Sequence, residues 1–317
     1  MKLIFMGTPE FAVPSLARLH SDGHDIVAVF TQPDKPVGRH RELHAPPVKV
    51  FALEHKIPVY QPAKIKTNEE VFSLFTTLQP DACIVAAYGK ILPERLLQIP
   101  KLGCINVHAS LLPKYRGAAP INWAIANGER ETGVTIMQMD AGMDTGGMFA
   151  KRATPIGEDE TAVELTVRLS QIGAELLSET LPGIECGEIR AEPQDDGEAT
   201  YAPILKREDG LIDWQKEAIE IANRVRAFQP WPAAYTIFRG GRLIIWQAKA
   251  ISSTVDSVAE LAKIVAMDKT GITIACANRT LLQVTEVQPE GKRRMPARDF
   301  VNGAHLHIGD NLTDAVR

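Results

Sequence analysis

Cysteine is scarce in this sequence. The chain has four cysteines among 317 residues, Cys83, Cys104, Cys186 and Cys276, and none of them stands in a Cys-x-x-Cys pair. A disulfide scaffold is typical of short chains dense in cysteine, and a zinc site of closely spaced cysteine pairs, so both are disfavoured here. We therefore expect a protein without disulfides and with no metal site.

Long apolar runs are also missing. None approaches the roughly 20 residues that a membrane-spanning helix requires. The apolar run at residues 2–6 is too short for a signal peptide and is followed by Gly7-Thr8-Pro9. We expect a cytoplasmic protein that makes no membrane contact, and we expect it to be a monomer.

No charge of one sign dominates the chain. The formal net charge is −4, so the molecule as a whole is not an obvious nucleic-acid binder, and we expect no DNA partner. A polyanion would have to be bound by local basic patches rather than by a field of the whole molecule.

The glycine-rich motifs of nucleotide-binding proteins are absent as well. Gly7 follows the first expected strand, but Pro9 and Phe11 stand where the Gly-x-Gly-x-x-Gly fingerprint needs close backbone approach. A Gly-x-x-x-x-Gly-Lys-Ser/Thr phosphate loop is not found either. A dinucleotide oxidoreductase is therefore disfavoured, and a phosphate loop is excluded.

The first part of the chain alternates between short apolar runs and segments with helical spacing of apolar residues. Such alternation predicts an α/β fold with a doubly wound, Rossmann-like sheet. The proline-rich segment 32–48 interrupts it and is expected to be a long loop. Strands are expected at 2–6, 25–30, 57–60, 81–87, 104–108 and 134–139, and helices at 11–20, 48–55, 68–78 and 161–184.

The pattern changes after residue 189. Residues 190–207 have the composition of a linker. After a helix at about 216–228, short strands recur at regular spacing, which indicates a small β-barrel, here taken as OB-like. We therefore expect a catalytic domain at 1–189, a linker at 190–207 and a C-terminal β-barrel domain at 208–317.

Two polar side chains stand two residues apart on the expected strand at 104–108. Because side chains alternate along a strand, Asn106 and His108 project from the same face. Ligands of open α/β sheets bind beyond the carboxyl ends of the strands, where this pair lies. An amide can donate to a developing oxyanion and an imidazole can take a proton from an amine, so the pair suits acyl transfer. Asp144, in the turn-rich segment after the next strand, is a candidate to orient the imidazole.

Structural alternatives stay open at this point. A histidine near a strand end is often a hydrogen-bonded structural residue, and Asp144 could serve the turn alone. Metal ligation is disfavoured because one histidine, one asparagine and a distant aspartate lack metal-ligand spacing.

The segment from Asn106 to Ile121, NVHASLLPKYRGAAPI, resembles the signature of the 10-formyltetrahydrofolate-dependent formyltransferases. The resemblance spans nearly the whole chain, and long motifs in the same order are more specific than any one of them. The further matching segments are FMGTPEF (5–11), TQPD (31–34), AYGKILP (87–93), ETGVTIMQMDAGMDTG (131–146), FQPWP (228–232) and QPEGK (288–292).

This resemblance implies roles for the shortlisted residues. Asn106, His108 and Asp144 match the catalytic trio of the family. The co-substrate implied is 10-formyltetrahydrofolate, whose formyl group would pass to an amine. The residues implied in folate binding are Ser110, Leu111, Leu112 and Pro113, with Tyr88, Gly89, Ile91, Leu92 and Asp140 in the pterin pocket.

The basic loop and the second domain favour initiator methionyl-tRNA as the acceptor, so the product would be N-formylmethionyl-tRNA for translation initiation. In family members that act on this tRNA, an insertion like 32–48 enters the end of the acceptor stem, and Arg39 is our first choice for a phosphate contact. A solvated surface loop is the alternative. The expected tRNA-binding residues are Lys35, Arg39, Arg41, Lys206, Arg207, Lys292, Arg293 and Arg294. We expect Trp231 to be packed rather than to stack on a base.

Rival interpretations are a relative that formylates a sugar-nucleotide amine or glycinamide ribonucleotide, and a folate-binding or RNA-binding protein without activity. The basic loop and the C-terminal domain argue against the first, and the intact trio argues against the second.

Overall fold

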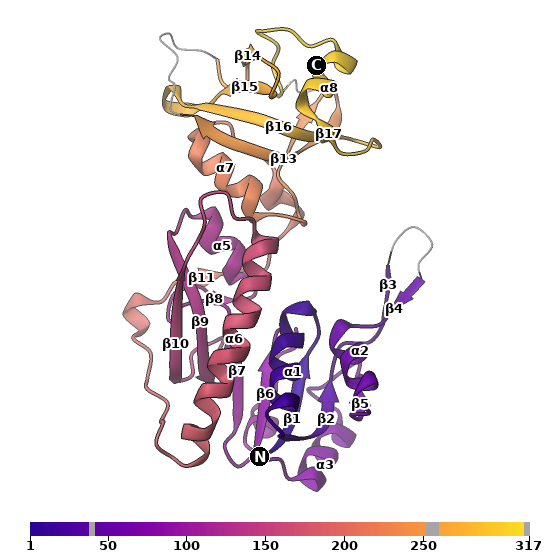
Figure 1. Ribbon diagram of the computed structural model, residues 1–317, viewed down its shortest axis with the longest axis vertical. Coiled ribbons are helices and arrows are strands. Elements are labelled where there is room, and N and C mark those ends of the chain that lie inside the picture. Colours follow the sequence, from indigo (N-terminus) through magenta and orange to yellow (C-terminus); the bar gives the residue numbers. More distant parts are fainter. Residues whose placement is uncertain (38–41, 252–259, 314–317) are drawn as a thin grey trace. The chain divides into compact units, whose positions relative to one another are not determined.

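The structure is a computed structural model that describes residues 1–37, 42–251 and 260–313. The chain forms two compact units (Figure 1). The first unit comprises residues 1–120, 131–155 and 165–202, and the second comprises residues 121–130, 156–164 and the chain from Pro203 onward. No helix among the described residues is long and apolar enough to cross a membrane.

The first unit is built on one mixed sheet. In the described residues this sheet has seven strands, parallel from β5 to β7, with β9 antiparallel to β7 and β10 antiparallel to β9. The Rossmann-like α/β expectation is confirmed. The order is β10 (Met148–Pro155), β9 (Glu131–Gln138), β7 (Cys104–His108), β6 (Ala82–Ala86), β1 (Lys2–Gly7), β2 (Asp25–Phe30) and β5 (Val59–Tyr60).

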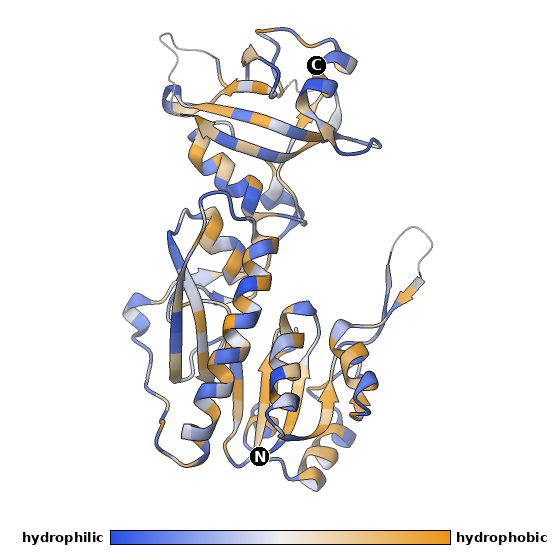
Figure 2. Ribbon diagram, viewed as in Figure 1, coloured by the Kyte–Doolittle hydropathy of each residue, from blue (hydrophilic) through white to orange (hydrophobic). Residues whose placement is uncertain are grey.

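Helices cover both faces of this sheet. The central strands are among the most hydrophobic segments of the chain (Figure 2), as expected for strands that are buried on both sides. On one face, Ile4 and Met6 of β1 pack with Phe72 and Phe75 of α3. The helices of this unit are α1 (Val13–Ser21), α2 (Pro47–Glu54), α3 (Glu69–Leu78), α4 (Glu94–Leu97) and α6 (Ala162–Glu185), with the short 3₁₀ helices Glu10–Ala12 and Asp196–Glu198.

Helix α6 lies close against β7 and β9 because it has a glycine at the contact. A Cβ on Gly173 would stand 2.8 Å from a methyl of Val107 and 3.4 Å from one of Val134. Val107 lies between Asn106 and His108 on β7, so its side chain points to the opposite face from theirs. The packing of α6 therefore leaves the Asn106 and His108 face of β7 free of this helix.

Three features differ from expectation. The segment 32–48 is not a plain loop, because β3 (Lys35–Val37) and β4 (Glu42–His44) pair antiparallel in it. Strand β10 was not expected, since its alternating polar side chains carry no apolar run. Part of the expected linker is built into the first unit, where β11 (Tyr201–Ala202) pairs with β8 (Arg116–Gly117).

The second unit contains the expected C-terminal β domain. Six strands among the described residues form an antiparallel sheet in the order β12-β13-β16-β15-β14, with β17 on β16. Its core joins Ile221 and Val225 of α7 to Ile245, Ile272 and Val284 of the sheet. The elements are α5 (Pro120–Ala126), α7 (Ala218–Ala227), α8 (Ala297–Ala304), β12 (Tyr235–Phe238), β13 (Gly241–Ile251), β14 (Ile264–Met267), β15 (Ile272–Ala275), β16 (Leu281–Pro289) and β17 (Met295–Pro296), with 3₁₀ helices at Arg207–Gly210 and Ala277–Arg279.

Candidate active site

Strand β7 ends at the candidate site. Asn106 lies opposite Val85 of β6 and Met137 of β9, and His108 lies opposite Thr135 of β9. His108 is buried, with 6% of its surface exposed, whereas Asn106 is half-buried. Asn106 therefore has a paired strand on each side and His108 has β9 on one side, which gives both side chains a fixed backbone from which to act.

The imidazole of His108 is held between a carbonyl and a carboxylate. Its Nε2 lies 3.0 Å from the carbonyl oxygen of Tyr115, and its Nδ1 lies 3.7 Å from Oδ2 of Asp144. Because a carbonyl oxygen only accepts, Nε2 carries the hydrogen and Nδ1 of the neutral ring keeps its lone pair. The 3.7 Å separation is too long for a hydrogen bond but close enough to stabilise a positive charge on the ring.

The side-chain amide of Asn106 points to a role as a hydrogen-bond donor. Among the residues that the structure describes, its side chain makes no hydrogen bond. Both amide hydrogens are therefore available to an acceptor in the site. A donor of this kind can stabilise an oxygen on which negative charge develops.

Asp144 is held in an unusual backbone conformation. Its φ of 56° lies in the left-handed region, which aspartate tolerates better than most residues. Its Oδ2 accepts a hydrogen bond of 2.8 Å from the backbone N–H of Gly117. That contact leaves the carboxylate anchored beside His108.

The segment Ser110–Pro113 forms a tight turn after β7, with a cis Leu112–Pro113 peptide. The Ser110 hydroxyl donates to the carbonyl of Lys114 at 2.6 Å. The Thr135 hydroxyl donates to the carbonyl of Ser110 at 2.7 Å and accepts the N–H of Leu112 at 3.1 Å. Thr135, which the sequence did not single out, therefore ties this turn to β9.

Of the residues predicted for the pterin pocket, some are buried in the core and others lie at the surface. Tyr88 and Leu92 lie in the hydrophobic core, and burial, followed by the nearby Cys83, raises the pKa of Tyr88 to about 12. Ile91 is 87% exposed, and Gly89 has a positive φ of 78°.

Asp140 organises the turn that leads to Asp144. Its carboxylate accepts the Thr145 hydroxyl at 2.8 Å and the Gly142 N–H at 3.0 Å. The structure therefore gives Asp140 a turn-stabilising contact.

A glutamine and an arginine complete the site, and the sequence pointed to neither. Gln194 contacts the backbone of the Asp144 loop, and Arg116 contacts Gln194. Arg116 lies within the signature segment, so position was a signal that could have identified it. Gln194 had no such signal, because it lies in a segment whose composition indicates a linker.

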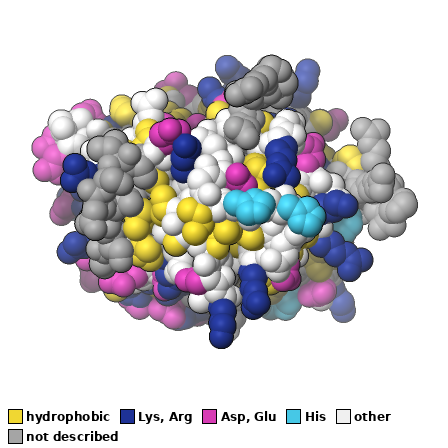
Figure 3. Space-filling view, turned by 90° about the horizontal axis from the view of Figure 1, so that it is seen from above, with side chains coloured by type: hydrophobic (Ala, Val, Ile, Leu, Met, Phe, Trp, Pro, Cys, Tyr) yellow, Lys and Arg dark blue, Asp and Glu magenta, His cyan; other side chains and the backbone are white. Residues whose placement is uncertain are grey.

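The predicted tRNA-binding cations that the structure describes belong to both units. Lys35 is exposed on β3, and the pKa of neighbouring Lys90 is lowered by burial and then by the positive charge of Lys35, so these ammonium groups lie near each other. Arg39 and Arg41 lie outside the described residues. On the face seen in Figure 3, Lys and Arg side chains are scattered among acidic, hydrophobic and uncharged ones.

In the second unit, the predicted cations Lys206, Arg207, Lys292, Arg293 and Arg294 are exposed. Arg294 pairs with Glu286 and lies over the ring of Trp246, 5.0 Å from its centroid. Trp231 is 54% exposed, so the expectation that it packs is wrong.

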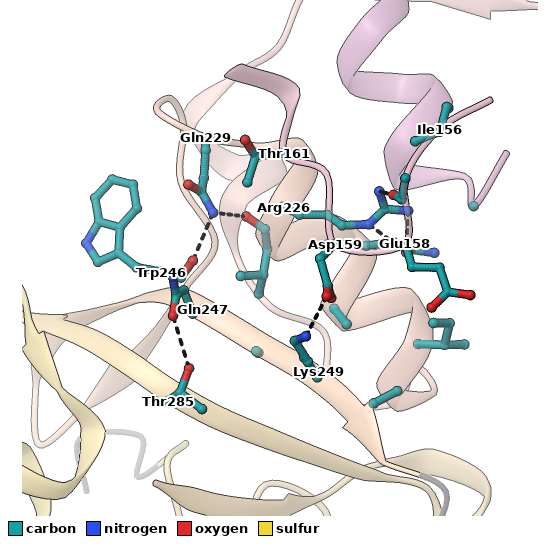
Figure 4. A pocket seen from close by; sticks show the side chains of 18 of the residues that line it. Ile156, Glu158, Asp159, Thr161, Arg226, Gln229, Trp246, Gln247, Lys249 and Thr285 are labelled. Carbon is teal, nitrogen blue, oxygen red and sulfur yellow. Dashed lines mark hydrogen bonds and ion pairs between the residues drawn. The ribbon is translucent and has the colours of Figure 1, made fainter. Parts of the chain in front are cut away.

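The second unit also contains a hollow of about 850 Å³ between α7, residues 156–161 and β13 (Figure 4). Two of its cations have partners: Lys249 pairs with Asp159 at 2.5 Å, and Arg226 donates to the carbonyls of Gly157 and Glu160 at 3.1 and 3.0 Å. Among the described residues that line it, none is a predicted site residue. In the described part of the chain, no group of three or more His, Cys, Asp and Glu could hold a metal ion.

Comparison with known proteins finds formyl transferases that match nearly the whole chain. The sequence model of the formyl transferase family matches residues 1–181, and that of the formyl transferase C-terminal domain matches residues 204–305. The methionyl-tRNA formyltransferase of Geobacter sulfurreducens is 49% identical over 315 residues, which cover 99% of this chain and 98% of that protein. The protein of the same name from Bacillus subtilis is 48% identical over 311 residues, which cover 98% and 97%.

A solved structure shares the fold at lower identity. The N-formyltransferase from Helicobacter canadensis, in complex with folinic acid and dTDP-3-aminofucose, superposes with a TM-score of 0.68 at 21% identity, covering 91% of this chain and 99% of that one. Family matches to both parts of the chain and full-length relatives at about half identity show that the chain belongs to the formyl transferase family.

Proposed function

We propose that this chain transfers the formyl group of 10-formyltetrahydrofolate to the α-amino group of initiator methionyl-tRNA. One observation carries the proposal: His108 and Asp144 face each other at the end of β7, in a chain about half identical over its full length to proteins named methionyl-tRNA formyltransferase. The sugar N-formyltransferase shares only the fold, at 21% identity.

His108 accepts the proton that the attacking amine loses and returns it to N10 of the folate, as the bond between the formyl carbon and N10 breaks and tetrahydrofolate leaves. The lone pair lies on Nδ1, since Nε2 donates to Tyr115. Once Nδ1 is protonated, it faces Oδ2 of Asp144, whose negative charge stabilises the cation. Asn106 donates to the formyl oxygen as negative charge develops there, which adds about 3–4 kcal/mol of transition-state stabilisation.

The co-substrate supplies the formyl group, and this chain orients it. Ser110–Pro113 line the folate beside His108, in a turn that Thr135 makes rigid. Ile91 and Met143, which lie in the family-matching segments 87–93 and 131–146, are 87% and 59% exposed. Large apolar side chains left in water at a site are suited to contact an aromatic ligand, so these residues fit a pterin.

The acceptor tRNA is held by local groups of cations rather than by the net charge of the whole molecule. We assign catalysis to residues 1–189 and tRNA-backbone contacts to residues 208–317, with Lys292 and Arg293 as exposed cations of the second region. Lys35 and Lys90 add positive charge in the first region.

A direct assay tests the proposal. The purified protein is incubated with 10-formyltetrahydrofolate and either charged initiator tRNA or an amino-sugar nucleotide, and each formylated product is measured. We expect formylmethionyl-tRNA and no formylated sugar. Turnover of the sugar nucleotide alone would assign the chain to the alternative function.

Variants of the trio test the roles. Asn106→Ala removes the oxyanion donor, and we expect kcat to fall by about 10²- to 10³-fold. Asp144→Ala is expected to lower kcat as well, because the charged imidazole loses its counter-charge. Near-native kcat in both variants would show that the trio is not the catalytic group.

A further inference from the structure

The chain after helix α6 returns to the candidate active site and holds the Asp144 loop from outside. The side-chain amide of Gln194 donates both hydrogens to this loop. Its Nε2 lies 2.8 Å from the carbonyl oxygen of Asp144 and 2.7 Å from that of Gly146. One side chain therefore bridges the carbonyl of Asp144 and that of the residue two positions on.

The orientation of this amide is set by Arg116. Oε1 of Gln194 accepts from Nε of Arg116 at 3.0 Å and from Nη2 at 2.8 Å. Because arginine only donates, the oxygen of the amide must face Arg116 and the NH₂ group must face the loop. Arg116 is 2% exposed, and its Nη2 also donates to Asp196 at 2.7 Å. The guanidinium is thus fixed, and it fixes the glutamine.

The same segment also sets the carboxylate of Asp144. Gly117, which donates its N–H to Oδ2 of Asp144, belongs to β8 and pairs with Ala202 of β11. A Cβ on Gly117 would stand 2.6 Å from the carbonyl oxygen of Ala202, so the two backbones are in close contact. Residues 194–202 therefore hold Asp144 in two ways. Gln194 binds its backbone carbonyl, and Ala202 positions Gly117, which binds its carboxylate.

Asp144 needs such support because its backbone is in the left-handed region, with a φ of 56°. A residue in that region keeps its conformation only when its surroundings impose it. The two hydrogen bonds from Gln194 fix the orientation of the Asp144 carbonyl and hold the chain that follows it, since they end on the carbonyls of Asp144 and Gly146. Their loss would free the loop to relax and move the carboxylate away from His108.

We propose that Gln194 is a positioning residue for formyl transfer, acting through Asp144 on His108. The inference rests on the proposed function, because it assigns Asp144 its role in charge stabilisation. Gln194 contacts the loop and Arg116, so its effect falls on the chemical step and not on substrate binding. Displacements of about 1 Å in such a group can cost on the order of 10²-fold in rate.

Two substitutions and a neighbouring control test this. Gln194→Met keeps the length of the side chain and removes every hydrogen bond, while Gln194→Glu keeps an acceptor for Arg116 and removes the donors to the loop. We expect both to lower kcat by about 10- to 100-fold with KM for each substrate nearly unchanged. Asp195→Ala, whose carboxylate bonds only Gly197 among the described residues, is expected to keep the parent kcat and KM.

Gln194→Glu keeps the experiment decisive if Gln194→Met folds poorly, because the buried Arg116 retains a partner. The combination with Asp144→Asn then separates positioning from general destabilisation. In that background there is no carboxylate to position, so Gln194→Glu should change the residual rate by less than about 2-fold.

A parent-like kcat in Gln194→Glu, or an equal loss in the parent and Asp144→Asn backgrounds, would overturn the inference. Absence of formyl transfer by the unsubstituted protein would instead overturn the proposed function.

Discussion

Thr135 offers a sharp test of how the folate-facing turn is held. Its side chain is completely buried, as is Ser110, and Leu112 is 1% exposed. The hydroxyl donates to the Ser110 carbonyl at 2.7 Å and accepts the Leu112 N–H at 3.1 Å. Thr135→Val keeps the shape of the side chain and deletes both hydrogen bonds.

The expected loss of stability follows from the two backbone groups that Thr135→Val leaves without a hydrogen-bond partner. One buried carbonyl and one buried N–H lose their partner, and each such group costs about 1–3 kcal/mol. We therefore expect the free energy of unfolding to fall by about 2–6 kcal/mol. The turn carries the proposed folate contacts, so KM for 10-formyltetrahydrofolate should rise in the same variant.

Urea denaturation of the parent, Thr135→Val and Thr135→Ser measures the stability. Thr135→Ser keeps the hydroxyl and loses one methyl group, which costs about 1 kcal/mol. If Thr135→Val proved as stable as Thr135→Ser, with an unchanged KM for the folate, the two hydrogen bonds would not anchor the turn.

Two further predictions concern a glycine that contacts the Asp144 carboxylate and the ion pair of Asp81. Gly117→Ala puts a Cβ 2.6 Å from the Ala202 carbonyl oxygen at a φ of 122°, so we expect losses of both kcat and stability, the strain alone costing about 1–3 kcal/mol. Gly187→Ala, with a φ of 77° and open space around it, is the control in activity assays and should keep the parent kcat; a parent-like Gly117→Ala would contradict the close contact. The pKa of Asp81 is held below its ordinary value by a hydrogen bond from Lys101 and by the backbone N–H of Lys2. A depressed pKa adds stability above the unfolded value of about 3.9, and this stability is lost as the pH falls through the lower folded pKa. Asp81→Asn should therefore be less stable than the parent at pH 7, and the gap should shrink below about pH 4; a gap that stays constant in urea titrations across this range would refute the linkage.

Much of the fold could be predicted because the pattern that carries it is local. The apolar runs of β1, β2, β6 and β7 stand out in the sequence since buried parallel strands are hydrophobic on both faces. Strand β10 escaped prediction for the opposite reason, because its alternating polar residues gain strand structure from pairing with β9 at the sheet edge. The pairing of β3 with β4 was likewise hidden by Pro36, a residue that is tolerated in an isolated pair of short strands.

Some residues of the candidate site could likewise be predicted from the sequence, and others could not. Asn106 and His108 were accessible because two residues on one strand share a face whatever the rest of the chain does. Trp231 was wrongly expected to pack, because a flanking proline says nothing about which surface an indole meets.

By itself, the sequence determined the strand that carries Asn106 and His108, the order of the α/β units and the family motifs, since these depend on near neighbours along the chain. The tertiary structure alone decided what surrounds them. It showed that Nε2 of His108 donates to Tyr115, that Thr135 holds the turn at Ser110, and that Gln194 holds the Asp144 loop from 50 residues away. Such contacts are set by where distant segments meet in the folded chain, and hydrophobic periodicity carries no information about those meetings.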